Sequence, residues 1–139
     1  MIAPPTLKQG DSVAIVAPAR SVNKNEIDPA IELIQQWGLK VITGDHLYAQ
    51  NHQFAGTDKQ RAGAFQEMLD IKDVKAIFCA RGGYGTIRTI MHLDFQRFRK
   101  QPKWIIGFSD ITVLHAYINT NLNIQTLHAQ MPADFPREK

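Results

Sequence analysis

The sequence predicts an α/β fold with a mostly parallel sheet, and three observations lead to this prediction. Short apolar runs rich in Val and Ile alternate along the chain with stretches of helical periodicity. Two of these runs, VAIVA at 13–17 and AIFCA at 76–80, are apolar throughout, as is typical of strands buried on both faces. Strands separated by helices need crossover connections, which make neighbouring strands parallel. The 139 residues suffice for one such domain, residues 1–139.

Five segments are expected to form strands because they are short, apolar and bounded by Gly, Pro or polar residues. They are residues 12–19, 39–43, 74–80, 103–108 and 123–129. With helices on both sides, such a sheet gives a three-layer sandwich of the Rossmann or flavodoxin-like type.

Helices are predicted between the strands. Asp28 is expected to cap the first, with Pro29 at its first position and Gly38 at its end. Thr57 or Asp58 is expected to cap a second helix that continues to residue 69. Residues 86–93 predict a short helix, and residues 110–120 predict a further one.

Composition excludes several classes of protein. The formal net charge is only +3, and a solvated helix end explains the densest basic group, RFRK at 97–100, at least as well as a nucleic-acid surface does. No run of 18 apolar residues could span a membrane, and the N-terminus lacks the pattern of a secretory signal. The single cysteine, Cys79, lies in an apolar run and is expected to be buried and inert. We expect a cytoplasmic protein that binds neither nucleic acid nor membrane.

Three unusual segments follow predicted strands and should meet at one edge of the sheet, because parallel strands present their carboxyl ends together. They are APAR (17–20), RGGYG (81–85) and GFSD (107–110). We call these residues the rim.

Ser109 stands where a strand runs directly into a helix, and two interpretations are open. It can be a nucleophile on a tight turn, with the N–H of Asp110 as one donor to an oxyanion. The familiar nucleophile elbow has glycines two residues on either side; Gly107 supplies the first, but Ile111 occupies the second place. Alternatively, Ser109 only caps the helix, a common role for serine.

The glycines of RGGYG allow the backbone to approach a ligand closely and to point N–H groups at it. The segment is neither a dinucleotide fingerprint nor a P-loop, and a plain tight turn is the alternative. Arg81 could bind a substrate carboxylate or pair with a structural acid.

None of the histidines is a convincing base for Ser109. His115 lies six residues further along the same predicted helix, about 9 Å away and on a poor face. His128 ends a predicted strand, where a structural role is favoured. His46 and His52 lie in a loop without metal-ligand spacing and are expected at the surface.

The segments around RGGYG and GFSD carry a family resemblance. The sequence resembles the LD-carboxypeptidases, a serine peptidase family that includes muramoyltetrapeptide carboxypeptidases and microcin C immunity peptidases. The resemblance covers nearly the whole chain, and ARGGYG followed by GFSDIT is its most specific part. The matching segments are GDSVAIVAPA (10–19), GTDKQRAGAFQEML (56–69), VKAIFCARGGYGTIR (74–88), IIGFSDITVLH (105–115) and LHAQM (127–131).

The resemblance implies that Ser109 is the nucleophile and that the backbone N–H groups of Gly83 and Asp110 form the oxyanion hole. Arg81, Gly82 and Tyr84 would line the substrate pocket. The implied reaction removes the terminal D-alanine from the murein tetrapeptide, in cytoplasmic recycling of peptidoglycan, with no metal and no organic cofactor.

The resemblance also implies a second, C-terminal domain that carries the glutamate and histidine of the triad and is absent from this chain, and a homodimer for the full-length protein. The isolated chain is then expected to be almost inactive. Two alternatives stay open: a microcin C-type immunity peptidase, and a non-catalytic module that binds an anionic small molecule.

Overall fold

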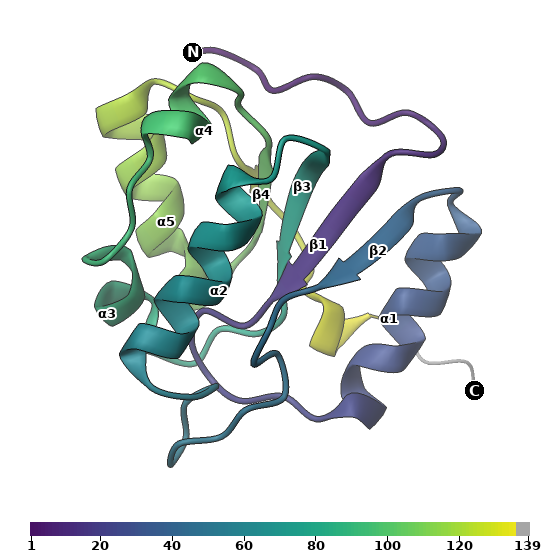
Figure 1. Cartoon of the computed structure of the whole chain (residues 1–139), viewed down its shortest axis with the longest axis vertical. Coiled ribbons are helices and arrows are strands. Elements are labelled where there is room, and N and C mark those ends of the chain that lie inside the picture. The colour runs from purple at the N-terminus through teal and green to yellow at the C-terminus, as the bar shows by residue number, and fades with distance from the viewer. Residues whose placement is uncertain (136–139) are drawn as a thin grey trace.

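A computed structural model describes residues 1–135 and contains one sheet of five strands, all parallel, as the alternation of apolar runs predicts (Figure 1). The strands are arranged in the order β2-β1-β3-β4-β5. Their bounds are β1 Ser12–Val16, β2 Lys40–Thr43, β3 Val74–Cys79, β4 Trp104–Gly107 and β5 Leu127–His128.

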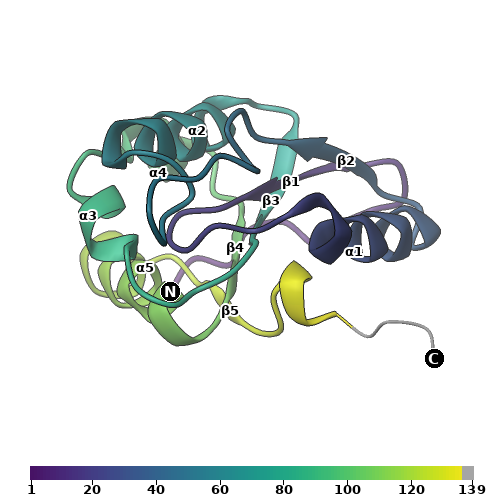
Figure 2. The ribbon, with the colours of Figure 1, turned by 90° about the horizontal axis from the view of Figure 1, so that it is seen from below.

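Helices cover both faces of the sheet and complete the expected three layers (Figure 2). The α-helices are α1 Lys24–Gln36, α2 Asp58–Asp70, α3 Thr86–Ile90, α4 Gln96–Lys100 and α5 Thr112–Tyr117. Shorter turns of helix are η1 Ser109–Ile111, η2 Ile118–Leu122 and η3 Pro132–Asp134.

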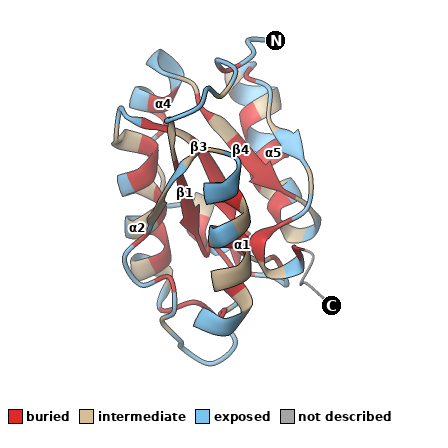
Figure 3. Ribbon diagram, turned by 90° about the vertical axis from the view of Figure 1, so that its right-hand side faces the viewer, coloured by how far each residue is buried: buried red, intermediate tan, exposed pale blue. Residues whose placement is uncertain are grey.

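The core has two halves because successive strand side chains point to opposite faces. Ala14 and Val16 of β1 join the cluster under α2, α4 and α5, whereas Val13 and Ile15 join the cluster under α1. All four side chains are at most 1% exposed. Burial on both faces explains why β1 is apolar throughout, and Figure 3 shows the buried residues concentrated along the sheet.

The start of α1 differs from the prediction. The helix begins at Lys24, because the Asn23 side chain accepts a hydrogen bond from the Glu26 N–H and the Glu26 carboxylate accepts one from the Asn23 N–H, both at 3.0 Å. This reciprocal pair is a stronger start signal than Asp28 followed by Pro29. Pro29 lies inside the helix, where it has no N–H to donate to the carbonyl of Asn25, an exposed residue four positions earlier.

The last strand is shorter than predicted. Residues 123–129 were expected to pair with the sheet, but only Leu127 and His128 pair with β4. Asn123 has a left-handed backbone with φ 57°, and Ile124 instead bridges to Ile2 at the N-terminus. The local apolar pattern does not distinguish these two partners.

The structure places the residues on which the composition argument depends. Cys79 is fully buried, and burial raises the pKa of its thiol. The basic residues of RFRK lie exposed in the last turn of α4, which matches their interpretation as a solvated helix end. No helix within residues 1–135 combines the length and the apolar character needed to cross a lipid bilayer.

Candidate active site

The rim forms as predicted, because loops from three neighbouring strands meet at the carboxyl end of the sheet. The N–H of Arg20, after β1, donates to the carbonyl of Gly82, after β3, over 3.2 Å. A Cβ added to Gly82 would lie 3.3 Å from the N of Asp110 and 3.6 Å from the Cβ of Ser109, both after β4. The glycine loop and the serine turn are therefore in van der Waals contact.

Ser109 lies at the junction of β4 and η1 with φ 59°, an uncommon backbone conformation for a residue with a side chain. It is exposed to solvent. Phe108, not Ser109, occupies the cap position of η1, and neither η1 nor α5 has a side-chain cap hydrogen bond. The serine therefore does not serve as a helix cap, and its backbone has the strained strand-to-helix geometry of a nucleophile elbow.

Packing explains both the glycine that matches the elbow pattern and the isoleucine that departs from it. A Cβ added to Gly107 would lie 2.9 Å from Cγ2 of Ile111, so only glycine fits there. Ile111 is fully buried in the core under α5. The side chain in the second glycine place of the pattern thus points into the protein and leaves the surface around Ser109 open.

The turn is held to the glycine loop by Asp110. Its Oδ2 accepts hydrogen bonds from both the N–H of Thr86, at 3.0 Å, and the hydroxyl of Thr86, at 2.7 Å. Thr86 is fully buried and directly follows the loop RGGYG. The sequence analysis missed this pair, because nothing local links residues 24 positions apart.

The glycine loop has the conformational freedom that the sequence predicts for it. Gly83 has φ 89° and is exposed, whereas Gly82 is buried against Asp110. Tyr84 also has a positive φ, 83°, and is 49% exposed beside Phe54, at a ring distance of 6.3 Å. An exposed glycine next to a buried one is well suited to present backbone N–H groups at the surface.

Arg81 forms the ion pair with an acid that the sequence analysis gave as one of its two possible roles. Its Nη2 lies 2.7 Å from Oε1 of Glu26, and its Nη1 donates to the carbonyl of Ser21 over 3.2 Å. The ion pair ties the glycine loop to the first turn of α1. The guanidinium is thereby engaged by groups of the protein itself.

A buried arginine supports the rim from below. Arg61 of α2 is 2% exposed and donates to the carbonyl oxygens of Pro18 and Gly56 and to the carboxylate of Asp58. It also lies 4.6 Å from the ring centroid of Phe54. The apolar periodicity of α2 hid this role, because Arg61 occupies a core-facing position.

The histidines lie as the sequence suggests, and none of those in residues 1–135 hydrogen-bonds to Ser109. His115 is buried, and its Nε2 lies 2.8 Å from the carbonyl oxygen of Gly107. Burial lowers the pKa of His115, so the ring is neutral near pH 7. His128 is exposed, 6.1 Å from the His115 ring, and His46 and His52 lie at the surface.

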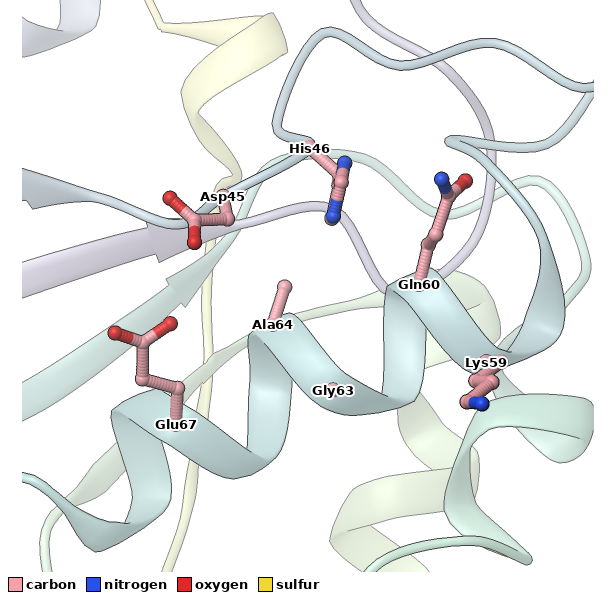
Figure 4. A pocket seen from close by; sticks show the side chains of 7 residues that line it. All are labelled: Asp45, His46, Lys59, Gln60, Gly63, Ala64 and Glu67. Carbon is pink, nitrogen blue, oxygen red and sulfur yellow. The ribbon is translucent and has the colours of Figure 1, made fainter.

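Two surface hollows are lined by residues that the sequence analysis discussed, but Ser109 lines neither of them. One of about 370 Å³ lies between α2 and the loop after β2 (Figure 4), lined by Asp45, His46, Lys59, Gln60, Gly63, Ala64 and Glu67. Another, of about 380 Å³, lies beside Arg81 and Glu26. Within residues 1–135, no three His, Cys, Asp or Glu side chains are grouped so that they could hold a metal ion.

Comparison with known proteins shows the family to which the chain belongs. Residues 13–129 match the sequence model of the LD-carboxypeptidase N-terminal domain. The chain belongs to the LD-carboxypeptidase family. It is 39% identical to the probable murein peptide carboxypeptidase of Bacillus subtilis, over 92% of this chain and 40% of that protein.

The immunity branch of this LD-carboxypeptidase family is also similar. The Microcin C7 self-immunity protein MccF of Escherichia coli is 31% identical over 94% of this chain and 38% of that protein. The crystal structure of an MccF-like protein from Bacillus anthracis superposes with a TM-score of 0.91 and 26% identity, over 100% of this chain and 43% of that one. The chain thus spans about two fifths of the length of the relatives it matches.

Proposed function

We propose that this chain is the nucleophile-bearing domain of a serine-type LD-carboxypeptidase. The proposal rests on one observation: an exposed Ser109 with φ 59°, free of any capping role, in contact with a glycine loop. Ser109 is the nucleophile, and the N–H groups of Gly83 and Asp110 donate to the oxyanion. Gly82 and Tyr84 line the pocket, whereas Arg81 positions the glycine loop through Glu26.

The reaction follows from these roles. The Oγ of Ser109 attacks the carbonyl carbon of the L,D-peptide bond while a base takes its proton, and the carbonyl oxygen becomes the oxyanion. The intermediate collapses, the C–N bond breaks and the departing D-alanine amine takes the proton. Water then attacks the acyl-enzyme, again with help from the base, and restores Ser109.

The base is proposed to be a histidine, oriented by a glutamate, in a C-terminal domain. In the described part of the chain no histidine bonds to Ser109, and the curated relatives are more than twice as long. The 139-residue chain alone should therefore hydrolyse an L,D-tetrapeptide only slightly. The substrate is proposed to be murein tetrapeptide, recycled in the cytoplasm by a homodimer of the two-domain protein without a cofactor.

A fluorophosphonate probe tests the nucleophile in the two-domain protein. Ser109 should displace fluoride and gain the phosphonyl group, which mass spectrometry of a tryptic digest locates at residue 109, and the Ser109→Ala variant should stay unlabelled. The unlabelled protein should release D-alanine from L-Ala-γ-D-Glu-L-Lys-D-Ala, and labelling of Ser109 should abolish this release. A protein that is neither labelled nor hydrolytic would instead be a non-catalytic binding module.

A second candidate function is hydrolysis of a peptidyl-nucleotide antibiotic, favoured by the similarity to MccF. Both candidates use the same serine and differ in the group that the pocket accepts. Comparing kcat/KM of the two-domain protein for the murein tetrapeptide and for an aspartyl sulfamoyl adenosine distinguishes them. We expect the tetrapeptide to be the better substrate.

A further inference from the structure

Arg20 and Arg81 belong to the rim and Arg61 and Arg88 lie next to it, and the structure separates these arginines into engaged and open ones. Arg81 is paired with Glu26, and Arg61 is buried with its guanidinium bonded on several sides. The guanidinium of Arg88 stacks on Phe54, 5.1 Å from the ring centroid. Arg20 differs: it is exposed, and within residues 1–135 its side chain has no hydrogen-bond or ion-pair partner.

Arg20 lies directly beside the proposed oxyanion hole. Its N–H donates to the carbonyl of Gly82, which fixes its backbone against the glycine loop. Its aliphatic stem covers Gly83, because a Cβ added to that glycine would lie 3.1 Å from Cδ of Arg20 and 3.4 Å from its Cβ. The guanidinium begins one bond beyond Cδ, so it lies within a few ångströms of the Gly83 backbone.

This position matches a chemical requirement of any carboxypeptidase. The residue to be released carries a free α-carboxylate three bonds from the scissile carbonyl carbon, about 3–5 Å from the carbonyl oxygen. If the N–H of Gly83 binds that oxygen, the carboxylate falls beside Gly83. A guanidinium binds a carboxylate through two parallel charge-assisted hydrogen bonds, which adds both affinity and orientation.

We propose that Arg20 binds the free α-carboxylate of the terminal residue and thereby restricts the reaction to chain ends. This inference rests on the proposed function, because it places the substrate relative to Gly83 and Ser109. It also reassigns the carboxylate-binding role that the sequence suggested for Arg81, whose guanidinium Glu26 and Ser21 engage. A side chain at Gly83 would crowd the stem of Arg20, because its Cβ would lie 3.1 Å from Cδ of Arg20.

The test compares two substrates that differ only at the terminus: L-Ala-γ-D-Glu-L-Lys-D-Ala with a free carboxylate, and the same peptide with a terminal amide. The two-domain protein should cleave the acid with a kcat/KM about 100-fold above that of the amide, given the strength of a charge-assisted pair. Arg20→Met retains the length of the stem and removes the charge. It should lower kcat/KM for the acid about 100-fold and leave the amide within about twofold.

Two further variants make the result specific. Arg20→Lys keeps a point charge without the planar fork and should recover part of the preference for the acid. Arg99→Met removes one positive charge from α4, which precedes β4 and therefore lies at the amino end of the strands, away from the rim. This variant should leave the preference for the acid unchanged. Equal unfolding temperatures would show that all variants fold.

The outcomes separate this inference from the function on which it rests. If the unaltered protein cleaves neither peptide, the proposed function fails. If it cleaves the acid but Arg20→Met lowers kcat/KM equally for both substrates, or for neither, then Arg20 does not bind the carboxylate. A wild-type protein that cleaves acid and amide equally well would also overturn the inference.

Discussion

Thr57 and Ser109 are hydroxyl residues at the starts of two helical segments, and their side chains have different roles there. Thr57 precedes α2 with an extended backbone, and its Oγ1 accepts a hydrogen bond from the N–H of Gln60 at 3.1 Å. Ser109 begins η1 with φ 59° and bonds to no N–H group of the helix that follows. The sign of φ thus separates a hydroxyl that stabilises the fold from one left available for chemistry.

The left-handed backbone conformation of Ser109 is energetically unfavourable, and contacts made by neighbouring residues offset this cost. A residue with a side chain in this region costs roughly 1–2 kcal/mol relative to the right-handed one. Gly107 permits close packing on Ile111, and Asp110 holds the turn through Thr86. The turn is therefore stabilised by its surroundings, whereas the start of α2 is stabilised by its own first four residues.

The largest expected effect is that of Ser109→Ala. In the two-domain protein it should reduce kcat for the L,D-tetrapeptide by at least about 10⁴-fold, as removal of a triad nucleophile does elsewhere. The unfolding free energy should stay within about 0.5 kcal/mol, because the exposed hydroxyl caps nothing. D-alanine release and urea unfolding measure the two quantities. A variant that retains a tenth of the activity would remove Ser109 from the mechanism.

A smaller effect is expected where the turn is fastened to the glycine loop. Thr86→Val keeps the shape of the side chain but removes the donor 2.7 Å from Oδ2 of Asp110. Loss of this hydrogen bond should displace the backbone N–H of Asp110. This should lower kcat about 10-fold with little change in KM, because an oxyanion donor acts mainly in the transition state. Thr86→Ser, which keeps the hydroxyl, is the matched control and should retain most of kcat. Equal losses in both variants would argue against this role.

At the other helix start the pattern should reverse. Thr57→Ala removes the cap and should lower the unfolding free energy by about 1 kcal/mol, while kcat and KM stay unchanged. Thr57→Ser should restore the stability. Urea unfolding of the three proteins, with D-alanine release as the second measurement, tests the contrast with Ser109. Lost activity at full stability would mean that α2 communicates with the site.

These two regions also show what a sequence can predict. The strands, their parallel direction and a cap at Thr57 or Asp58 follow from patterns within a few residues, and the sequence analysis predicts them. The pair Asn23 and Glu26 is equally local, but the sequence analysis placed the helix start at the other local signal, Asp28 followed by Pro29.

The site itself depends on longer separations. Arg81 meets Glu26 across 55 residues, and Thr86 meets Asp110 across 24, so both pairs follow from strand order and register instead of a motif. Ser109 could be placed at a strand end from the sequence. The positive φ of Ser109 could not be predicted, because Ile111 replaces the second glycine of the usual pattern.

The smallest expected effect is a change of the unfolding free energy with pH. It is caused by His115, which hydrogen-bonds to the carbonyl of Gly107 before the serine turn. His115 donates from Nε2 to the carbonyl of Gly107, so its buried Nδ1 is the acceptor nitrogen and has no partner within residues 1–135. Protonation would put an N–H there without an acceptor, and the neighbouring His128 further disfavours the charge. The folded-state pKa therefore lies below the unfolded value of about 6.5.

The sign of the effect on stability follows from that order. As the pH falls from 7 through 6.5, the unfolded chain binds a proton at His115 that the folded chain does not, so the unfolding free energy decreases. Urea unfolding between pH 7 and 5 should show this loss in the unaltered protein and a shallower one in His115→Gln, whose amide can still donate to Gly107. Since both proteins share every other titrating group, their difference isolates His115. Identical slopes would mean that the ring is protonated as readily in the folded chain as in the unfolded one.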